Sequence, residues 1–339
     1  MFDEPPQDDR TSDRDAVAVA PIRLLLTPDM PLHRSILNLA AVAVLVSTVA
    51  HAEVVHYAGK ADALPHDEYV RVVSEVESPI QQTYIKAKDG VYLAAALRKP
   101  RGSGPFPAII IFHGAPGGRG MEQLVGWSRG DHGGPVWERF LQEGFVVAVA
   151  DYRGGDYNTV NKPSSSVVTA IDDGVSVIDY VRALPEVDES RITVYGVSLG
   201  GNLAMFLASR VPTLRSVIVG APAPIWFLGY EVPPGPRPDF ASAAPDPKIV
   251  QAHIEPIRAP ILIQVGTQDR LLALDTVLHD QLVRHGKQVR MEIYEHGYHD
   301  FVLGPQGQQR GDLPHGEILM QGTLDALERA VQFAKAPPN

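Results

Sequence analysis

The pentapeptide Gly196-Val197-Ser198-Leu199-Gly200 has the G-x-S-x-G pattern that holds a nucleophilic serine. An apolar stretch typical of a strand, residues 191–195, precedes it, and a stretch compatible with a helix, residues 201–210, follows it. Glycines permit a sharp turn from strand to helix and leave the hydroxyl of Ser198 uncovered. A short motif also arises by chance as an ordinary Gly/Ser turn, so it indicates a candidate nucleophile that needs partners.

A serine nucleophile requires a base and an acid that orients the base. The apolar run 261–265 ends in Gly266-Thr267-Gln268-Asp269, which places a carboxylate at the end of a predicted strand. A second predicted strand, 288–294, is followed by His296-Gly297-Tyr298-His299-Asp300-Phe301. We therefore expect His299 to be the base and Asp269 to be the acid.

These candidates have rivals. Asp300 adjoins His299, but a sequence neighbour seldom reaches the far side of the ring, and Asp275 is a similar outsider. His296 and His299 would suggest a metal pair if they lay on a helix, but Gly297 and the loop context disfavour that reading. The chain has no cysteine and no H-E-x-x-H pattern, so we expect neither a metal nor a cofactor.

The transition state also needs donors for a developing oxyanion. The buried-strand pattern 107–112 runs into His113-Gly114-Ala115-Pro116-Gly117-Gly118, a loop able to bring a backbone N–H to the substrate. The N–H of Leu199, the residue after the nucleophile, is the other expected donor. We expect His113 to hold the shape of the loop. The glycines of this loop are not followed by the Lys-Ser/Thr of a phosphate-binding loop, so we do not expect the loop to bind phosphate.

The chain order Ser198, Asp269, His299 is the order found in α/β-hydrolases. Residues 81–334 resemble that superfamily, and within it the prolyl-oligopeptidase catalytic domain and the dienelactone-hydrolase-like proteins. The resemblance implies a serine hydrolase and makes Ala115 the second oxyanion donor, since Pro116 has no N–H. It is carried by the following segments: His113-Gly114-Ala115-Pro116, Asp151-Tyr152-Arg153-Gly154, Val187-Asp188-Glu189-Ser190-Arg191-Ile192, Gly266-Thr267-Gln268-Asp269 and Gly297-Tyr298-His299-Asp300-Phe301.

Two departures limit the resemblance. Dienelactone hydrolases proper use a cysteine nucleophile, whereas this chain has no cysteine and offers Ser198. Prolyl oligopeptidases proper carry a gating β-propeller, and the segment before Gln81 is too short to form one. The sequence therefore leaves open whether an ester or an amide is cleaved.

The rest of the sequence predicts an α/β fold. Predicted strands and helices alternate, which indicates a doubly wound, mostly parallel sheet. The turn Asp89-Gly90 joins strands 81–88 and 91–97 into an antiparallel hairpin at its edge, and residues 53–78 look irregular. The other predicted strands are 108–112, 145–151, 192–197, 216–220, 261–265 and 288–294, and the helices are 136–143, 167–184, 202–209, 273–285 and 318–334.

The proline-rich stretch 221–260 leaves little room for regular structure and is expected to lie above the active site. Its aromatic residues Trp226, Phe227, Tyr230 and Phe240 either line the substrate pocket or anchor the stretch to the domain. The segment Gly130-Asp131-His132-Gly133-Gly134 is a weaker candidate for another pocket wall.

The N-terminal region resembles a secretory signal peptide over residues 30–52. It has a basic start near Arg34, an apolar run at 36–49 and the small-x-small site Ala50-His51-Ala52. We expect translation from Met30, with residues 1–29 as an artefact of start assignment or a disordered extension, and one mature domain at 53–339. An uncleaved anchor is the alternative, but the apolar run is shorter than the roughly 20 residues of a spanning helix.

Composition restricts the partners. With 30 Lys+Arg against 40 Asp+Glu, the 339 residues carry a formal charge of −10 and show no basic cluster, which disfavours nucleic acid as a partner.

Taken together, these features of the sequence predict an exported serine hydrolase that acts on a small ester or short peptide. The alternatives are a non-catalytic binding protein of the same fold and a metal-dependent hydrolase at His296 and His299.

Overall fold

The computed structural model describes residues 53–57, 78–115, 117–129, 134–153, 167–231, 244–299, 301–303 and 316–336. The chain divides into two units, Met1–Ser47 and Thr48–Asn339, and every described residue belongs to the second. The expected signal peptide, Phe240 and the segment 130–133 lie outside the described residues. Along the described chain, no helix combines the length and apolar character needed to cross a membrane.

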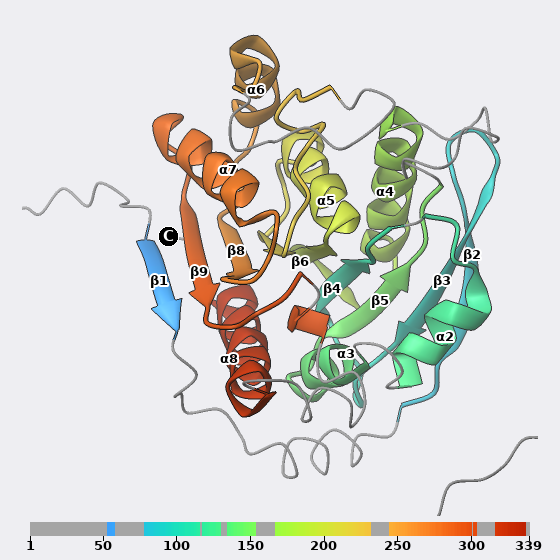
Figure 1. Ribbon diagram of the computed structural model, residues 1–339. Coiled ribbons are helices and arrows are strands. Elements are labelled where there is room, and N and C mark those ends of the chain that lie inside the picture. Colours follow the sequence, from blue (N-terminus) through green and yellow to red (C-terminus); the bar gives the residue numbers. More distant parts are fainter. Residues whose placement is uncertain are drawn as a thin grey trace, which may run out of the picture. The chain divides into compact units, whose positions relative to one another are not determined.

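A nine-stranded sheet runs through the described residues in the order β1-β9-β8-β7-β6-β4-β5-β3-β2 (Figure 1). All neighbouring strands are parallel except for the two pairs that contain β3, so the predicted doubly wound sheet with an antiparallel edge hairpin is confirmed. The strands are β1 (Glu53–Tyr57), β2 (Gln81–Lys86), β3 (Tyr92–Arg98), β4 (Phe106–Phe112), β5 (Val146–Ala150), β6 (Val187–Val197), β7 (Ser216–Gly220), β8 (Ile261–Gly266) and β9 (Val289–Tyr294).

Helices cover both faces of this sheet (Figure 1). Strand β4 shows why, because it is apolar at successive positions and supplies two cores. Ile110 and Phe112 join the core of the α4–α7 face, whereas Ile109 and Ile111 join the core of the other face. The first face has α4 (Val167–Arg182), α5 (Leu199–Arg210), α6 (Pro247–Ile254) and α7 (Leu272–Arg284); the second has α2 (Met121–Arg129), α3 (Gly134–Gln142) and α8 (Gly316–Lys335).

Two expectations about irregular segments are wrong. Residues 53–57 form β1, which pairs with β9 in parallel. Within the proline-rich stretch, α6 begins at Pro247, because proline fits the first helical position, where no N–H is needed. The side chain of Asp246 caps this helix by accepting from the N–H of Lys248 at 2.8 Å and from that of Ile249 at 3.3 Å.

The strand order reverses at β4, and this reversal positions the site. Strand β4 lies between β5 and β6, and Phe112 at its end pairs with Gly196 of β6. Loops that leave such neighbouring strands toward opposite faces open a crevice at the carboxyl edge of the sheet, where α/β proteins bind ligands. The expected oxyanion loop follows β4 and the expected nucleophile follows β6, so both lie at this crevice.

Candidate active site

Ser198 occupies a strained turn between β6 and α5. Its backbone angles are φ 55° and ψ −117°, which L-residues rarely adopt. A Cβ on Gly196 would lie 2.1 Å from the carbonyl oxygen of Gly200, and one on Gly200 would lie 2.1 Å from the carbonyl oxygen of Phe112. Both motif glycines are thus required by backbone contacts, which pack the first turn of α5 against the end of β4.

The three predicted triad residues meet at the carboxyl edge of the sheet. The His299 Nε2 atom lies 2.8 Å from the Ser198 Oγ atom. The His299 Nδ1 atom lies 3.1 Å from Oδ1 and 3.0 Å from Oδ2 of Asp269. Since Ser198 follows β6, Asp269 follows β8 and His299 follows β9, residues far apart in sequence form one hydrogen-bonded line.

Burial and bonding fix the roles that these groups can take. The Asp269 side chain is 0% exposed and the His299 ring is 30% exposed. Asp269 Oδ1 also accepts from the N–H of Leu271 at 2.9 Å, which holds the carboxylate in place. Because an ionised carboxylate only accepts, Nδ1 carries the ring proton, and Nε2 is left as an acceptor for the serine hydroxyl.

The rivals are placed differently. Asp275 lies on α7 with both carboxylate oxygens buried and, among the described residues, without a hydrogen-bond partner. Burial and the nearby charge of Asp269 raise its pKa well above the usual value. His296 has φ 58° and its N–H donates to the Thr267 hydroxyl at 2.9 Å. Asp300 lies outside the described residues. Among the described residues, no group of three or more His, Cys, Asp or Glu side chains could hold a metal ion.

The segments that carry the two expected oxyanion donors lie next to the nucleophile. Leu199 is the first residue of α5, so its N–H has no partner within the helix and lies at the positive end of the helix dipole. Gly114 packs so closely that a Cβ there would lie 3.2 Å from the Ser198 Cβ atom. The next residue, Ala115, is exposed, and the loop that carries it therefore borders the serine.

The aromatic residues after β7 differ in burial. Phe227 is 0% exposed and packs between Phe206 and His253, with ring centroids 5.3 Å from each. Phe227 is therefore an anchor of the proline-rich stretch, one of the two roles that the sequence left open. Tyr230 is also buried, and this burial raises its pKa. Trp226 is half-buried against the same core.

Sequence reasoning missed two features. Asp151 directly follows β5 and bonds to His113, and the signal that identified Asp269, an acid at the end of a parallel strand, would have found it. A small apolar hollow, partly open to solvent and with a cavity volume of about 10 Å³, also borders Leu199. Helices α4 and α5 and the end of β5 line it, through Tyr152, Val167, Ala170, Ile171, Leu199, Asn202, Leu203 and Phe206.

A parallel sheet that brings together a strand–serine–helix turn, a histidine and an acid is the arrangement of the α/β-hydrolases. The sequence model of the family described as "Dienelactone hydrolase family" matches residues 93–312, which are more than half of the chain. The chain belongs to the dienelactone hydrolase family.

Individual proteins are more distant. The quorum-quenching protein AidA of Acinetobacter baumannii (strain MDR-ZJ06) is 29% identical over 133 residues, which are 39% of this chain and 40% of AidA. Acylamino-acid-releasing enzyme 2 of Oryza sativa subsp. japonica is 23% identical over 225 residues, 58% of this chain and 28% of that enzyme. The chain thus spans less than half the length of these two relatives.

Solved structures share the fold at low identity. A putative dienelactone hydrolase from Klebsiella pneumoniae subsp. pneumoniae MGH 78578 has a TM-score of 0.56 at 18% identity, covering 77% of this chain and 100% of that one. The propionate-bound esterase Est2 of Thermogutta terrifontis has a TM-score of 0.54 at 24% identity, covering 77% of this chain and 97% of that one. These structures confirm the fold, and the family match over residues 93–312 confirms the recognised superfamily.

Proposed function

We propose that this protein is a serine hydrolase that cleaves carboxylic esters of small molecules through an acyl-enzyme. One observation carries the proposal, the continuous hydrogen-bonded line from the Ser198 hydroxyl through the His299 ring to the Asp269 carboxylate. A serine hydroxyl becomes a nucleophile when a neighbouring base removes its proton during attack, and this line supplies the base and its orienting acid.

In the first half of the reaction, Ser198 Oγ attacks the ester carbonyl carbon while its proton passes to His299 Nε2. The carbonyl π bond opens, the negative charge collects on oxygen, and Asp269 stabilises the imidazolium. His299 then gives this proton to the departing alcohol as the C–O bond breaks. Water repeats the cycle on the acyl-enzyme, loses its proton to His299, and releases the acid as Ser198 regains its own.

The backbone N–H groups of Leu199 and Ala115 are the proposed oxyanion donors. The helix terminus at Leu199 and the contact between Gly114 and Ser198 support this assignment. The acyl group would lie against the small hollow beside Leu199, whose lining is almost wholly apolar. Its two polar side chains already have partners, since the Tyr152 hydroxyl donates to the His113 carbonyl and the Asn202 oxygen accepts from the Phe227 N–H. An uncharged acyl group fits such a lining.

The other hypotheses are weaker. Similarity to an acylamino-acid-releasing enzyme keeps cleavage of an amide as a second candidate. A metal site at His296 and His299 is disfavoured because both ring nitrogens of His299 are engaged by Ser198 and Asp269. A non-catalytic binding protein would have no use for three aligned triad groups.

A substrate panel tests the proposal. Purified protein is assayed on p-nitrophenyl esters of increasing acyl length and on aminoacyl p-nitroanilides, with Ser198→Ala as the matched control. We expect hydrolysis of the short esters, labelling by a fluorophosphonate probe, and loss of both in Ser198→Ala. Turnover or labelling that survives in Ser198→Ala would contradict the choice of nucleophile, and a clear preference for anilides would replace the esterase by a peptidase.

We also propose export through a signal peptide at residues 30–52. The basic, apolar and small-residue pattern supports this proposal, and so does the start of β1 at Glu53, because cleavage after Ala52 would leave that strand whole. Expression from Met30 followed by fractionation and N-terminal sequencing tests it. We expect an exported protein that begins near Glu53, and a retained protein with residues 30–52 intact would refute export.

A further inference from the structure

Asp151, which directly follows β5, gathers the loop after β4 around one buried carboxylate. The Asp151 side chain accepts from His113 Nε2 at 3.1 Å and from the N–H groups of Gly118 at 2.9 Å, Gly120 at 2.8 Å and Tyr152 at 2.8 Å. Three of these four donors belong to residues 113–120, the loop that carries the proposed donor of Ala115. One acid thus joins both ends of that loop.

His113 and Tyr152 make further contacts that hold the same loop. The two rings stack with centroids 4.8 Å apart, and the Tyr152 hydroxyl donates to the His113 carbonyl at 2.8 Å. The His113 Nδ1 atom lies 2.7 Å from the carbonyl oxygen of Gly114, and Trp127 packs against the ring at a centroid distance of 5.2 Å. The imidazole is therefore held on its edges and its face, which fixes the start of the loop.

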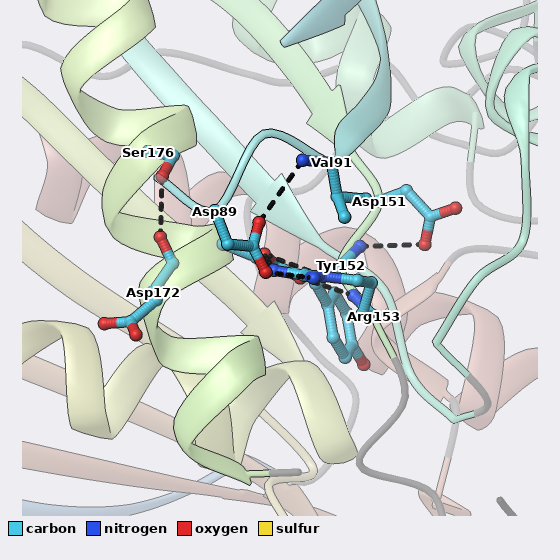
Figure 2. Close-up of polar contacts among 8 residues, drawn as sticks. Asp89, Val91, Asp151, Tyr152, Arg153, Asp172 and Ser176 are labelled. Atoms are coloured by element: carbon cyan, nitrogen blue, oxygen red, sulfur yellow. Dashed lines mark hydrogen bonds and ion pairs between the residues drawn. The ribbon is translucent and has the colours of Figure 1, made fainter. Parts of the chain in front are cut away.

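Arg153 fixes the end of β5 to the rest of the domain. Its backbone N–H donates to Asp173 on α4 at 2.8 Å, and its guanidinium donates to the same fully buried carboxylate at 2.6 Å. On the other side the guanidinium bonds to Asp89 in the hairpin turn at 2.5 Å (Figure 2). The segment from Asp151 to Arg153 is thus rigidly placed, and it can serve as a fixed support for the loop.

The loop transmits this support to the nucleophile. Gly114 is flanked by His113 and Ala115, and its backbone lies against Ser198. We propose that Asp151 and Tyr152 are positioning residues, which hold the β4 loop so that its oxyanion donor stays aimed at the tetrahedral intermediate. This inference rests on the proposed function and assigns a role to two residues of the Asp151-Tyr152-Arg153-Gly154 segment that the triad does not use.

The protonation state of Asp151 agrees with this role. Burial works against its ionisation, but the hydrogen bonds from His113 and from the N–H groups of Gly120 and Tyr152 outweigh burial and hold the pKa below its usual value. Asp151 is therefore ionised at neutral pH and acts only as an acceptor, as four donors require.

Two variants test the inference, Asp151→Asn and Tyr152→Phe. Asp89→Asn is the matched control, because it makes the same chemical change in a carboxylate that contacts Arg153 from outside and does not contact the loop. Active sites are counted with a fluorophosphonate, and kcat and KM per active site are measured with p-nitrophenyl acetate. Affinity is measured for a trifluoromethyl ketone, which adds to the serine as a tetrahedral oxyanion adduct.

For Asp151→Asn we expect kcat per site and trifluoromethyl ketone affinity to fall together by about 10- to 100-fold, with little change in KM. Tyr152→Phe keeps the ring and loses one hydrogen bond, so we expect a parallel loss of roughly tenfold or less. Asp89→Asn should stay within about twofold, because solvent-exposed ion pairs contribute little.

Per-site kcat and ketone affinity equal to those of the unmodified protein in Asp151→Asn would overturn the inference, even if fewer sites were competent. If Asp151→Asn does not fold, Tyr152→Phe decides, and unchanged ketone affinity in that variant overturns it. Failure of the proposed function looks different, because the unmodified protein itself would then neither turn over esters nor be labelled at Ser198.

Discussion

Replacing Asp269 by asparagine reverses one hydrogen bond in the proposed triad and leaves its shape intact. The Leu271 N–H, 2.9 Å from Oδ1, keeps the amide oxygen at that position. The amide nitrogen then takes the place of Oδ2, 3.0 Å from His299 Nδ1. Two donors would face each other at that position, and the amide oxygen, 3.1 Å from Nδ1, is already engaged by the Leu271 N–H. The conflict ends when the ring proton moves to Nε2, because Nδ1 then accepts from the amide nitrogen. Nε2 can then no longer accept the proton of Ser198.

The expected cost follows from this tautomer. Loss of the orienting acid in a Ser-His-Asp triad lowers kcat by about 10⁴. Because each factor of ten corresponds to about 1.4 kcal/mol, a decline of 10³ to 10⁴ is roughly 4 to 5.5 kcal/mol of transition-state stabilisation. The variant keeps the volume and the Leu271 contact of the original side chain, so the fold should persist.

The assay compares kcat on p-nitrophenyl acetate for the unmodified protein, Asp269→Asn and Asp275→Asn, after active sites have been counted. Asp275 is a matched control, since it is a buried acid on the following helix α7 whose carboxylate has no hydrogen-bond partner among the described residues and whose pKa is raised well above the usual value. We expect Asp275→Asn to remain near the unmodified rate. A kcat within tenfold of the unmodified value in Asp269→Asn would refute the reasoning.

Three further predictions concern stability. Burial and the charge of Asp269 raise the pKa of Asp275, so the native state keeps this proton to higher pH than the unfolded chain, which ionises above about pH 4. This group's stabilising contribution is therefore lost as the pH rises. Asp275→Asn should therefore raise the Tm more at pH 8 than at pH 4, and equal gains would contradict this. Gly200→Ala would place a methyl group against the Phe112 carbonyl. We therefore expect urea unfolding to show a destabilisation of at least about 1 to 3 kcal/mol, and we expect fluorophosphonate labelling to be lost. Normal labelling of this variant would be inconsistent with the close packing. Phe227→Ala should cost about 3 to 5 kcal/mol in urea unfolding with kcat per active site retained, whereas a loss of kcat without destabilisation would give Phe227 a role in the site.

The parts of the site that sequence reasoning located lie at the ends of buried parallel strands. Ser198, Asp269 and His299 each follow an apolar run, and the carboxyl ends of such runs must share one edge of a parallel sheet. Local pattern and global topology agree at these positions. That agreement makes three distant residues predictable as neighbours, and the hydrogen-bonded line joins them.

Strand β1, helix α6 and the role of Asp151 escaped prediction for different reasons. Strand β1 is only 5 residues long, and β9, the strand with which it pairs, lies more than two hundred positions further along the chain. Helix α6 was hidden by its surrounding prolines, although Pro247 and the cap Asp246 are themselves features of a helix start. The role of Asp151 was missed because its partners, Gly118 and Gly120, are backbone groups of another loop.

The parallel pairing of β1 with β9 has a practical consequence for handling this protein. Tyr57 pairs with Tyr294, so β1 points its last residue toward the rim that holds His299 and its first residue, Glu53, toward the opposite rim. A purification tag or reporter fused ahead of Glu53 would thus begin on the side remote from the nucleophile. Such a fusion would leave the carboxyl rim of the sheet clear, whereas an insertion directly after Tyr57 would start on the rim that holds His299.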